Sequence, residues 1–255
     1  MSNYTNNYQV PYQIPYGSGQ TAAQDDSWAP DDLTGISGWY AVGDIGDFYQ
    51  DHTQTTAVTA EGDPVGTWIN KSGGSHFTQA TAGLRPTYQG SYIDSDADYL
   101  QGPNLSLNQQ LLLGVSATVR QLGAWSAIFS HGATAFTANP GLFIGADTTA
   151  GRIKVYIEGG NNFALTGLSL GDRVTTIIRI TYSNPNYLVD CWFNGTKQSQ
   201  LNAGTGLSNG TSSPTWLTAG YPNAGTHDLY GYVLATGSAY SDEDATELNT
   251  YLEAL

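Results

Sequence analysis

Residues 173–195 read RVTTIIRITYSNPNYLVDCWFNG, and this stretch decides the fold class. Its first part, Arg173–Tyr182, is apolar and rich in β-branched residues, which is typical of a central strand. A second apolar segment, Leu188–Phe193, follows and stops at Asn194-Gly195. That dipeptide is the one best suited to a type I′ hairpin turn. The stretch therefore predicts a central strand and a second strand that ends in a tight hairpin.

Outward from this stretch, other segments alternate with a period of two residues. Leu113–Arg120 places Leu113, Val115, Ala117 and Val119 on one face, and Gly114, Ser116, Thr118 and Arg120 on the other. Arg152–Glu158 likewise turns Ile153, Val155 and Ile157 one way and Arg152, Lys154, Tyr156 and Glu158 the other. Tyr230–Thr236 is a late strand. Such alternation predicts strands with one buried face and one wet face, and the fold class is an all-β antiparallel sandwich or jelly roll.

One helix is expected, at the end of the chain. Ser241 is a suitable N-cap, and three acidic residues follow it in the first turn. The apolar stripe consists of Ala245, Leu248, Leu252 and Leu255. We expect this helix to close over one edge or end of the sandwich.

Composition excludes several classes of protein. The 255 residues carry 8 Lys+Arg against 22 Asp+Glu, a formal net charge of −14, and 40% are apolar. Disordered chains have high charge and few aromatic residues, whereas this chain has 12% charged residues and 17 Tyr. The negative charge opposes binding to nucleic acid and to anionic membrane surfaces. We therefore expect a folded domain with neither as a partner.

The single cysteine and the N-terminus bear on location. Cys191 is alone, so it can form no intrachain disulfide, and its apolar context predicts a buried, inert thiol. The start of the chain, MSNYTNN, has neither the basic nor the apolar region of a signal peptide. No stretch approaches the roughly 20 apolar residues that cross a bilayer. We expect a protein made in the cytoplasm, without a signal peptide.

The first 32 residues differ from the rest. Tyrosines recur every four residues, with two prolines between them, at Tyr4, Tyr8, Pro11, Tyr12, Pro15 and Tyr16. The prolines forbid a helix, so the segment is expected to be extended or polyproline-like. One interpretation is a disordered tail. The other is an arm, residues 1–32, that anchors the domain of residues 33–255 by docking its tyrosines on a neighbouring subunit.

Several phrases in that domain occur in an order that resembles a known family. They are Ser37–Tyr40, Phe48–Asp51, Gly62–Trp68, Lys71–Gly73, Thr78–Thr81, Arg85–Tyr88, Val189–Gly195, Leu229–Val233 and Ser241–Leu252. This series resembles the concanavalin A-like, laminin-G-type jelly rolls found in tailed-phage structural proteins and in surface proteins. The resemblance covers roughly residues 33–255 and implies a concanavalin A-like β-sandwich, and a virion location. It says little about function, because this fold hosts lectins, hydrolases and structural modules.

Three aspartates at alternate positions, Asp94, Asp96 and Asp98, invite comparison with a calcium site. An EF-hand loop would need Gly at its sixth position and Glu at its twelfth, where this chain has Tyr99 and Leu105. In an extended segment the three carboxylates would share one solvated face. We expect no cofactor, with calcium held between loops as the alternative.

Catalytic patterns are missing from the sequence. Glycosidases need two carboxyl groups across the scissile bond, and no strand carries glutamates at alternate positions. His52, His76, His131 and His227 have no metal-ligand spacing, which is typical of surface or turn histidines. We expect a protein that is not an enzyme.

A glycan site has its own candidates. His227 and Asp228 are expected in a loop with Tyr221 and Asn223, a mixture that stacks on sugars and hydrogen-bonds to them. Trp192 is out of phase with the apolar residues around it and is expected to face away from the main core. Either the loop residues or Trp192 could serve a carbohydrate site, and burial in a core or an interface is the alternative for each aromatic residue.

Three functions remain open. The first is a virion structural protein of a phage-type particle, a capsid decoration or head/tail fibre component, joined to other virion proteins and to copies of itself through the arm. The second is a glycan-binding adhesin that recognises host-surface polysaccharide. The third and weakest is a glycoside hydrolase.

Overall fold

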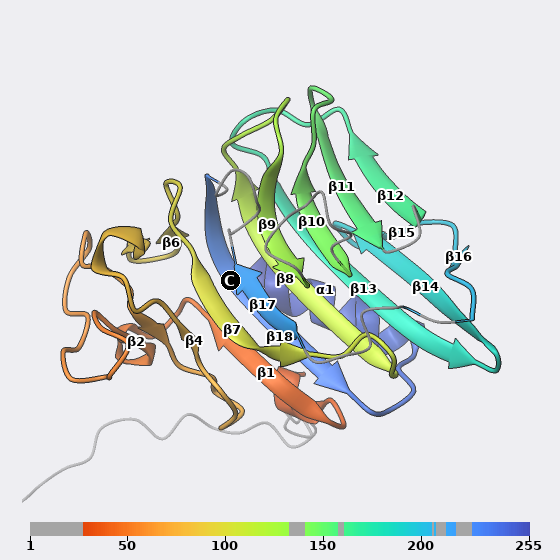
Figure 1. Ribbon diagram of the computed structural model, residues 1–255, viewed down its shortest axis with the longest axis horizontal. Coiled ribbons are helices and arrows are strands. Elements are labelled where there is room, and N and C mark those ends of the chain that lie inside the picture. The colour runs from red at the N-terminus through yellow and green to blue at the C-terminus, as the bar shows by residue number, and fades with distance from the viewer. Residues whose placement is uncertain (1–27, 133–140, 158–160, 206, 208–212, 218–225) are drawn as a thin grey trace, which may run out of the picture.

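A computed structural model describes residues 28–132, 141–157, 161–205, 207, 213–217 and 226–255. Two antiparallel sheets lie face to face, and one helix crosses the outer side of one of them (Figure 1). The fold is therefore an all-β sandwich with a C-terminal helix, as the sequence predicted. Among the described residues, no helix is long and apolar enough to cross a membrane.

Sheet A carries the helix. Its strands run in the order β15-β14-β13-β8-β18-β6-β5, and β1 and β16 pair with β18 and β14. The bounds are β1 Ile36–Ala41, β5 Thr87–Tyr88, β6 Ile93–Asp94, β8 Leu111–Val119, β13 Arg173–Ser183, β14 Asn186–Phe193, β15 Thr196–Lys197, β16 Leu201–Asn202 and β18 His227–Thr236.

Sheet B forms the other layer, in the order β12-β11-β10-β9-β17-β7-β4-β3-β2. The bounds are β2 Phe48–Tyr49, β3 Thr67–Trp68, β4 Phe77–Thr78, β7 Leu100–Leu105, β9 Ser126–His131, β10 Leu142–Ala146, β11 Arg152–Ile157, β12 Asn161–Thr166 and β17 Ser213–Leu217. Short 3₁₀ turns lie at Pro30–Asp32, Ile45–Asp47 and Ala82–Leu84, and the helix α1 spans Asp242–Ala254.

The hairpin predicted from residues 173–195 is confirmed. β13 and β14 pair along eight positions, and β13 lies between β14 and β8, where a central strand belongs. Asn194 (φ 46°) and Gly195 (φ 73°) both adopt the left-handed backbone that a two-residue hairpin turn requires. Phe193 then pairs with Thr196, so the turn passes directly into β15.

The period-two alternation predicts the buried and exposed faces of β11 correctly, and those of β8 only in part. In β11, Ile153, Val155 and Ile157 are buried and the residues between them are half-buried, as expected. In β8 the predicted wet face is wrong for Gly114 and Ser116, which are buried. The reason is α1, because a Cβ added to Gly114 would lie 2.6 Å from Cδ1 of Leu252. The helix turns the first half of that face into a second core.

There are consequently two apolar layers. The main core fills the space between the sheets and includes Trp68, Phe77 and Phe129, together with Cys191, whose thiol pKa is raised by burial and by Asp190. The second lies between sheet A and α1, and its members are Leu33, Leu112, Ile177, Trp192, Val233, Ala235, Tyr240, Ala245, Leu248 and Leu252.

Helix α1 begins as the sequence predicted. Ser241 is the N-cap and accepts a hydrogen bond from the backbone N–H of Asp244, whose carboxylate accepts one from the N–H of Ser241. Ala245, Leu248 and Leu252 are buried, as expected from the stripe. Before β1, Trp28 packs edge-on against Tyr251 and Pro30 is buried, so residues 28–32 lie against the sandwich.

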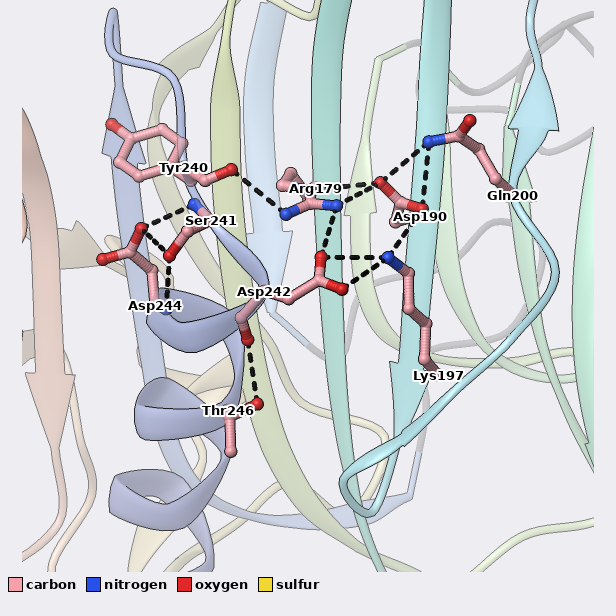
Figure 2. Close-up of polar contacts among 9 residues, drawn as sticks. All are labelled: Arg179, Asp190, Lys197, Gln200, Tyr240, Ser241, Asp242, Asp244 and Thr246. Carbon is pink, nitrogen blue, oxygen red and sulfur yellow. Dashed lines mark hydrogen bonds and ion pairs between the residues drawn. The ribbon is translucent and has the colours of Figure 1, made fainter.

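A buried ion network fastens α1 to sheet A (Figure 2). Asp190 of β14 is fully buried, and its Oδ2 lies 2.7 Å from Nη2 of Arg179 on β13. The same Nη2 lies 2.7 Å from Oδ1 of Asp242, the first residue of α1. Lys197 of β15 lies 2.9 Å from Asp242 and 3.4 Å from Asp190, and Gln200 donates a hydrogen bond to Asp190. Two sheet cations are thus shared between a buried and an exposed aspartate.

Replacing Asp190 with Ala should be strongly destabilising, because it leaves Arg179 beneath the helix without its buried counter-charge. We expect a loss of about 3–5 kcal/mol in the free energy of unfolding, measured by urea denaturation. Asp242→Ala is the matched control. Its side chain is 61% exposed, so it should cost about 1 kcal/mol or less. Equal losses in the two variants would contradict the role given to Asp190.

Candidate functional site

Two residues predicted for different sites, Asp94 and Asp228, lie side by side. They are register partners between β6 and β18 on the outer face of sheet A. Arg120, which follows β8, joins them: its Nε lies 2.8 Å from Oδ1 of Asp228, and its Nη1 lies 3.3 Å from Oδ2 of Asp94. One guanidinium therefore holds two carboxylates at the end of this sheet.

Two tyrosine rings flank this ion pair. Tyr92 precedes β6 and Tyr230 belongs to β18, and their ring centroids lie 6.1 Å apart. Arg120 donates a hydrogen bond to the hydroxyl of Tyr92 and lies 5.6 Å from its ring centroid. The hydroxyl of Tyr230 lies 3.0 Å from that of Thr118. Both tyrosines are half-buried, so part of each residue is accessible to solvent.

Arg173, the first residue of β13, closes the other side. Its guanidinium carbon lies 3.9 Å from the centroid of Tyr230. It donates hydrogen bonds to Oγ of Ser116 and, at 2.7 Å, to the backbone carbonyl of Leu252 in the last turn of α1. That last turn has no basic residue of its own, so Arg173 supplies the positive charge that stabilises a helix C-terminus.

The electrostatics of this cluster follow from partial burial. Burial raises the pKa of the Asp228 carboxyl, and Arg120 offsets only part of that effect. Burial by itself would lower the pKa of the Arg120 guanidinium, but Asp228 and Asp94 raise it overall. Burial lowers the pKa of Arg173. Arg120 and Asp228 thus favour each other's charged forms in a setting that is drier than bulk water.

We call Tyr92, Asp94, Arg120, Arg173, Asp228 and Tyr230 the Arg120 face. It combines partly exposed aromatic rings with carboxylates and guanidinium groups held in fixed positions. Rings of this kind stack on the apolar faces of sugars, and the charged groups form strong hydrogen bonds with hydroxyls. The face can therefore bind a polyhydroxylated ligand.

The structure describes three of the predicted carbohydrate residues, and all three are buried: Asp228 is 6% exposed and lies in β18, not in a loop. Trp192 does face away from the main core, but α1 covers it and only 3% of it is exposed. With so little of the ring exposed, no sugar can stack on it; its neighbours include Arg179 and Lys197, at 5.1 and 5.0 Å from the ring centroid. His227 is not in a loop: it starts β18 and is fully buried.

The remaining predicted site residues lie outside the described part of the chain. Tyr221 and Asn223 belong to residues 218–225, and the arm residues Tyr4, Tyr8, Pro11, Tyr12, Pro15 and Tyr16 to residues 1–27.

The histidines are divided between the surface and the core. His52 is exposed and His76 accepts a hydrogen bond from the backbone N–H of Asn70, as turn histidines do. His131 and His227 lie in strands β9 and β18 and are buried, so the expectation of surface histidines is wrong for these two. The ring of His227 lies 2.8 Å from the hydroxyl of Ser126, and burial lowers its pKa to about 4.

The three aspartates of residues 94–98 do not form a straight, solvated row. Ala97 takes a left-handed backbone (φ 60°), and Asp96 is exposed while Asp98 is half-buried. Burial raises the pKa of Asp98, and the neighbouring Asp96 and Asp94 add to that rise. Within the described residues, no group of three or more His, Cys, Asp or Glu side chains is arranged to hold a metal ion.

Reasoning from sequence missed Arg120, Arg173, Tyr92 and Tyr230 as members of one site. Three of them, Arg120, Arg173 and Tyr230, are terminal residues of the predicted strands. What could have joined them is strand order, because β8, β18 and β6 are neighbours in space but not in the chain.

No protein-family model matches this chain, and no curated protein does. Among solved structures it is similar to the sialidase of Trypanosoma rangeli. The complex with 2,3-difluorosialic acid has a TM-score of 0.60 at 10% identity, over 86% of this chain and 33% of that one. The complex with 2,3-difluoro-KDN has a TM-score of 0.58 at 11% identity over the same shares. The chain spans about a third of the sialidase, and the likeness shows a β-sandwich fold.

Acid should destabilise the protein through His227. The unfolded histidine binds a proton below its ordinary pKa of 6.5, whereas the buried one stays neutral until about pH 4. Stability from this group is therefore intact above pH 6.5 and is lost as the pH falls toward 4, by about 3 kcal/mol in all.

The measurement is urea unfolding at several pH values for wild type and His227→Gln, and the readout is the difference between the two curves. The difference in free energy of unfolding between wild type and His227→Gln should shrink by most of the ~3 kcal/mol between pH 7 and pH 4. His52→Gln, at an exposed position, is the control and should parallel wild type. A pH-independent difference for His227→Gln would refute the assignment.

Chelation should leave the fold unaffected. Asp94 is already paired with Arg120, so a cation would have to displace a guanidinium. We expect EDTA and added calcium to shift the melting temperature by less than about 1 °C. A rise of several degrees with calcium would show a bound ion that stabilises the native state.

Proposed function

We propose that this chain is a glycan-binding β-sandwich and that the Arg120 face is its binding site. The observation that carries the proposal is the meeting of Tyr92 and Tyr230, half-buried and 6.1 Å apart, with two carboxylates and two guanidinium groups at one end of sheet A. The net charge of −14 opposes polyanionic ligands, so we expect uncharged polysaccharides to bind.

We also propose that the chain binds glycans without hydrolysing them. Asp94 and Asp228 are both ion-paired with Arg120, so neither stands apart as the proton donor that a glycosidase requires. The support from sequence is the absence of a strand with alternate glutamates.

The proposed setting is the surface of a phage-type particle. What supports it is the family resemblance of residues 33–255 and the tyrosine and proline repeat of residues 8–16. In this setting the chain is a virion structural protein, a capsid decoration or a head or tail fibre component. Its arm holds it to other subunits while the sandwich displays the Arg120 face.

Binding should depend on the exposed aromatic surface. A panel of bacterial surface polysaccharides would identify a ligand, and calorimetry would then compare the variants. Tyr230→Ala and Tyr92→Ala should each weaken binding at least tenfold, since each removes a stacking surface worth about 1–3 kcal/mol. Tyr182→Ala is the matched control, because Tyr182 is 45% exposed but lies at the far end of β13.

Equal affinity in all three variants would show that the Arg120 face is not the binding site. The same incubations, assayed for reducing sugar, test the absence of hydrolysis. Thermal melts of each variant separate a lost contact from a lost fold, because Tyr230 also contacts Thr118 and Arg173.

A further inference from the structure

The arm carries a second regularity besides its tyrosine repeat. In residues 8–16 every even position is apolar and every odd one is Gln or Pro, and the even set is Tyr8, Val10, Tyr12, Ile14 and Tyr16. Alternate side chains of a β-strand share a face, so as a strand the segment has one wholly apolar face. A polyproline helix has three residues per turn and would point Tyr8, Tyr12 and Tyr16 in three directions. The pattern therefore favours a strand.

The two prolines lie on the same edge of that strand, so its two edges differ in their ability to pair. Backbone groups of alternate residues point to opposite edges, and Pro11 and Pro15 are both odd. Every missing N–H thus falls on one edge, while the even edge keeps the donors of Val10, Tyr12 and Ile14. Such a strand can pair along its even edge only. Its odd edge stays unpaired, and that is the position in which proline is tolerated in sheets.

Sheet B offers an edge of suitable length. β12, six residues long, is its end strand, and β11 is its one strand partner among the described elements. The other end strands, β2, β5, β15 and β16, have two residues each. The outer edge of β1 is taken, because Asn70 bonds to Trp39 and Ser37 and Lys71 bonds to Trp39.

Like the arm strand, β12 has an apolar face toward the core and a second face toward solvent. Phe163 is buried and Leu165 half-buried, and both belong to the main core, as does the half-buried Leu168 just after the strand. Ala164 and Thr166 point outward and are exposed. A strand added here, apolar face inward, would extend the core over the exposed parts of Leu165 and Leu168.

The start of the described chain bears on which copy is used. The described residues begin at Trp28, which packs on α1 outside sheet A, whereas β12 is the end strand of the other layer, sheet B. The eleven residues 17–27 span at most about 36–40 Å when fully extended. Reaching β12 of the same chain needs a path around the sandwich, whereas β12 of a second copy needs none.

We propose that residues 8–16 add as an edge strand to β12 of a second copy of this chain, with the even residues paired and facing its core. This rests on the anchoring role proposed above for the arm. Strand addition combines backbone hydrogen bonds with pockets for alternate side chains, and one-sided prolines end the sheet after a single added strand.

A proline scan tests the pairing edge, with sedimentation equilibrium as the measurement. Val10→Pro and Ile14→Pro keep an apolar side chain but remove a pairing donor, and each should raise the dissociation constant of the assembly at least tenfold. Gln9→Pro and Gln13→Pro place proline on the unpaired edge and should change it less than twofold. Similar effects at even and odd positions, or a monomeric full-length chain, would overturn the proposal.

Disulfide trapping tests the partner strand. Chain carrying Gln13→Cys is mixed with chain carrying Ala164→Cys or Thr166→Cys and oxidised, and a covalent dimer should appear on a non-reducing gel. Thr196→Cys, exposed on the end strand β15 of sheet A, is the control and should not cross-link. Cys191 is buried and does not compete. Equal trapping at β15, or none at β12, would refute this docking site.

The outcomes separate this inference from the anchoring role. If removing residues 1–27 abolishes assembly but Val10→Pro does not, the strand geometry is wrong and anchoring stands. If removal leaves assembly unchanged, both fail. Glycan binding by the same variants should remain at the wild-type level, since the Arg120 face lies on sheet A.

Discussion

The buried carboxylate of Asp190 is the charge on which the outer layer of this protein depends. It lies with no exposed surface on β14, paired with Arg179 and Lys197, and through them it reaches Asp242 at the start of α1. A buried ion pair adds little net stability but is costly to break. Here it links the first residue of α1 to β13 and β14, while the apolar stripe of α1 supplies the favourable burial against sheet A.

The position of the helix in turn decides where the sheet stays accessible. α1 covers Leu112 and Gly114 of β8, and its last turn ends at Ala254. Residues further along the same face of β8 lie beyond the helix. Thr118 and Arg120 there meet β18 and β6, and Arg173 joins the cluster to the last helical turn. The Arg120 face is thus a part of the outer surface that lies beyond the last turn of α1.

The sequence by itself determined the features that depend on neighbouring residues. Period-two alternation identified β11, Asn194-Gly195 identified the hairpin turn, and Ser241 with the leucine stripe identified α1. Each of these follows from local backbone geometry, so a short window contains the whole signal. The sequence also singled out Asp94 and Asp228, though for two different sites.

Only the tertiary structure decided which surfaces are covered and which distant residues meet. The sequence correctly predicts that Trp192 faces away from the main core, but its burial depends on a helix that begins at Asp242. The sequence places His227 in a loop because no local pattern shows that β18 starts there, where its backbone and ring contact Ser95 and Ser126. Asp94 and Asp228 became one site because β6 pairs with β18, and Arg120 lies at the end of the next strand. Strand order and layering are set by the burial of the whole chain, which no single segment encodes.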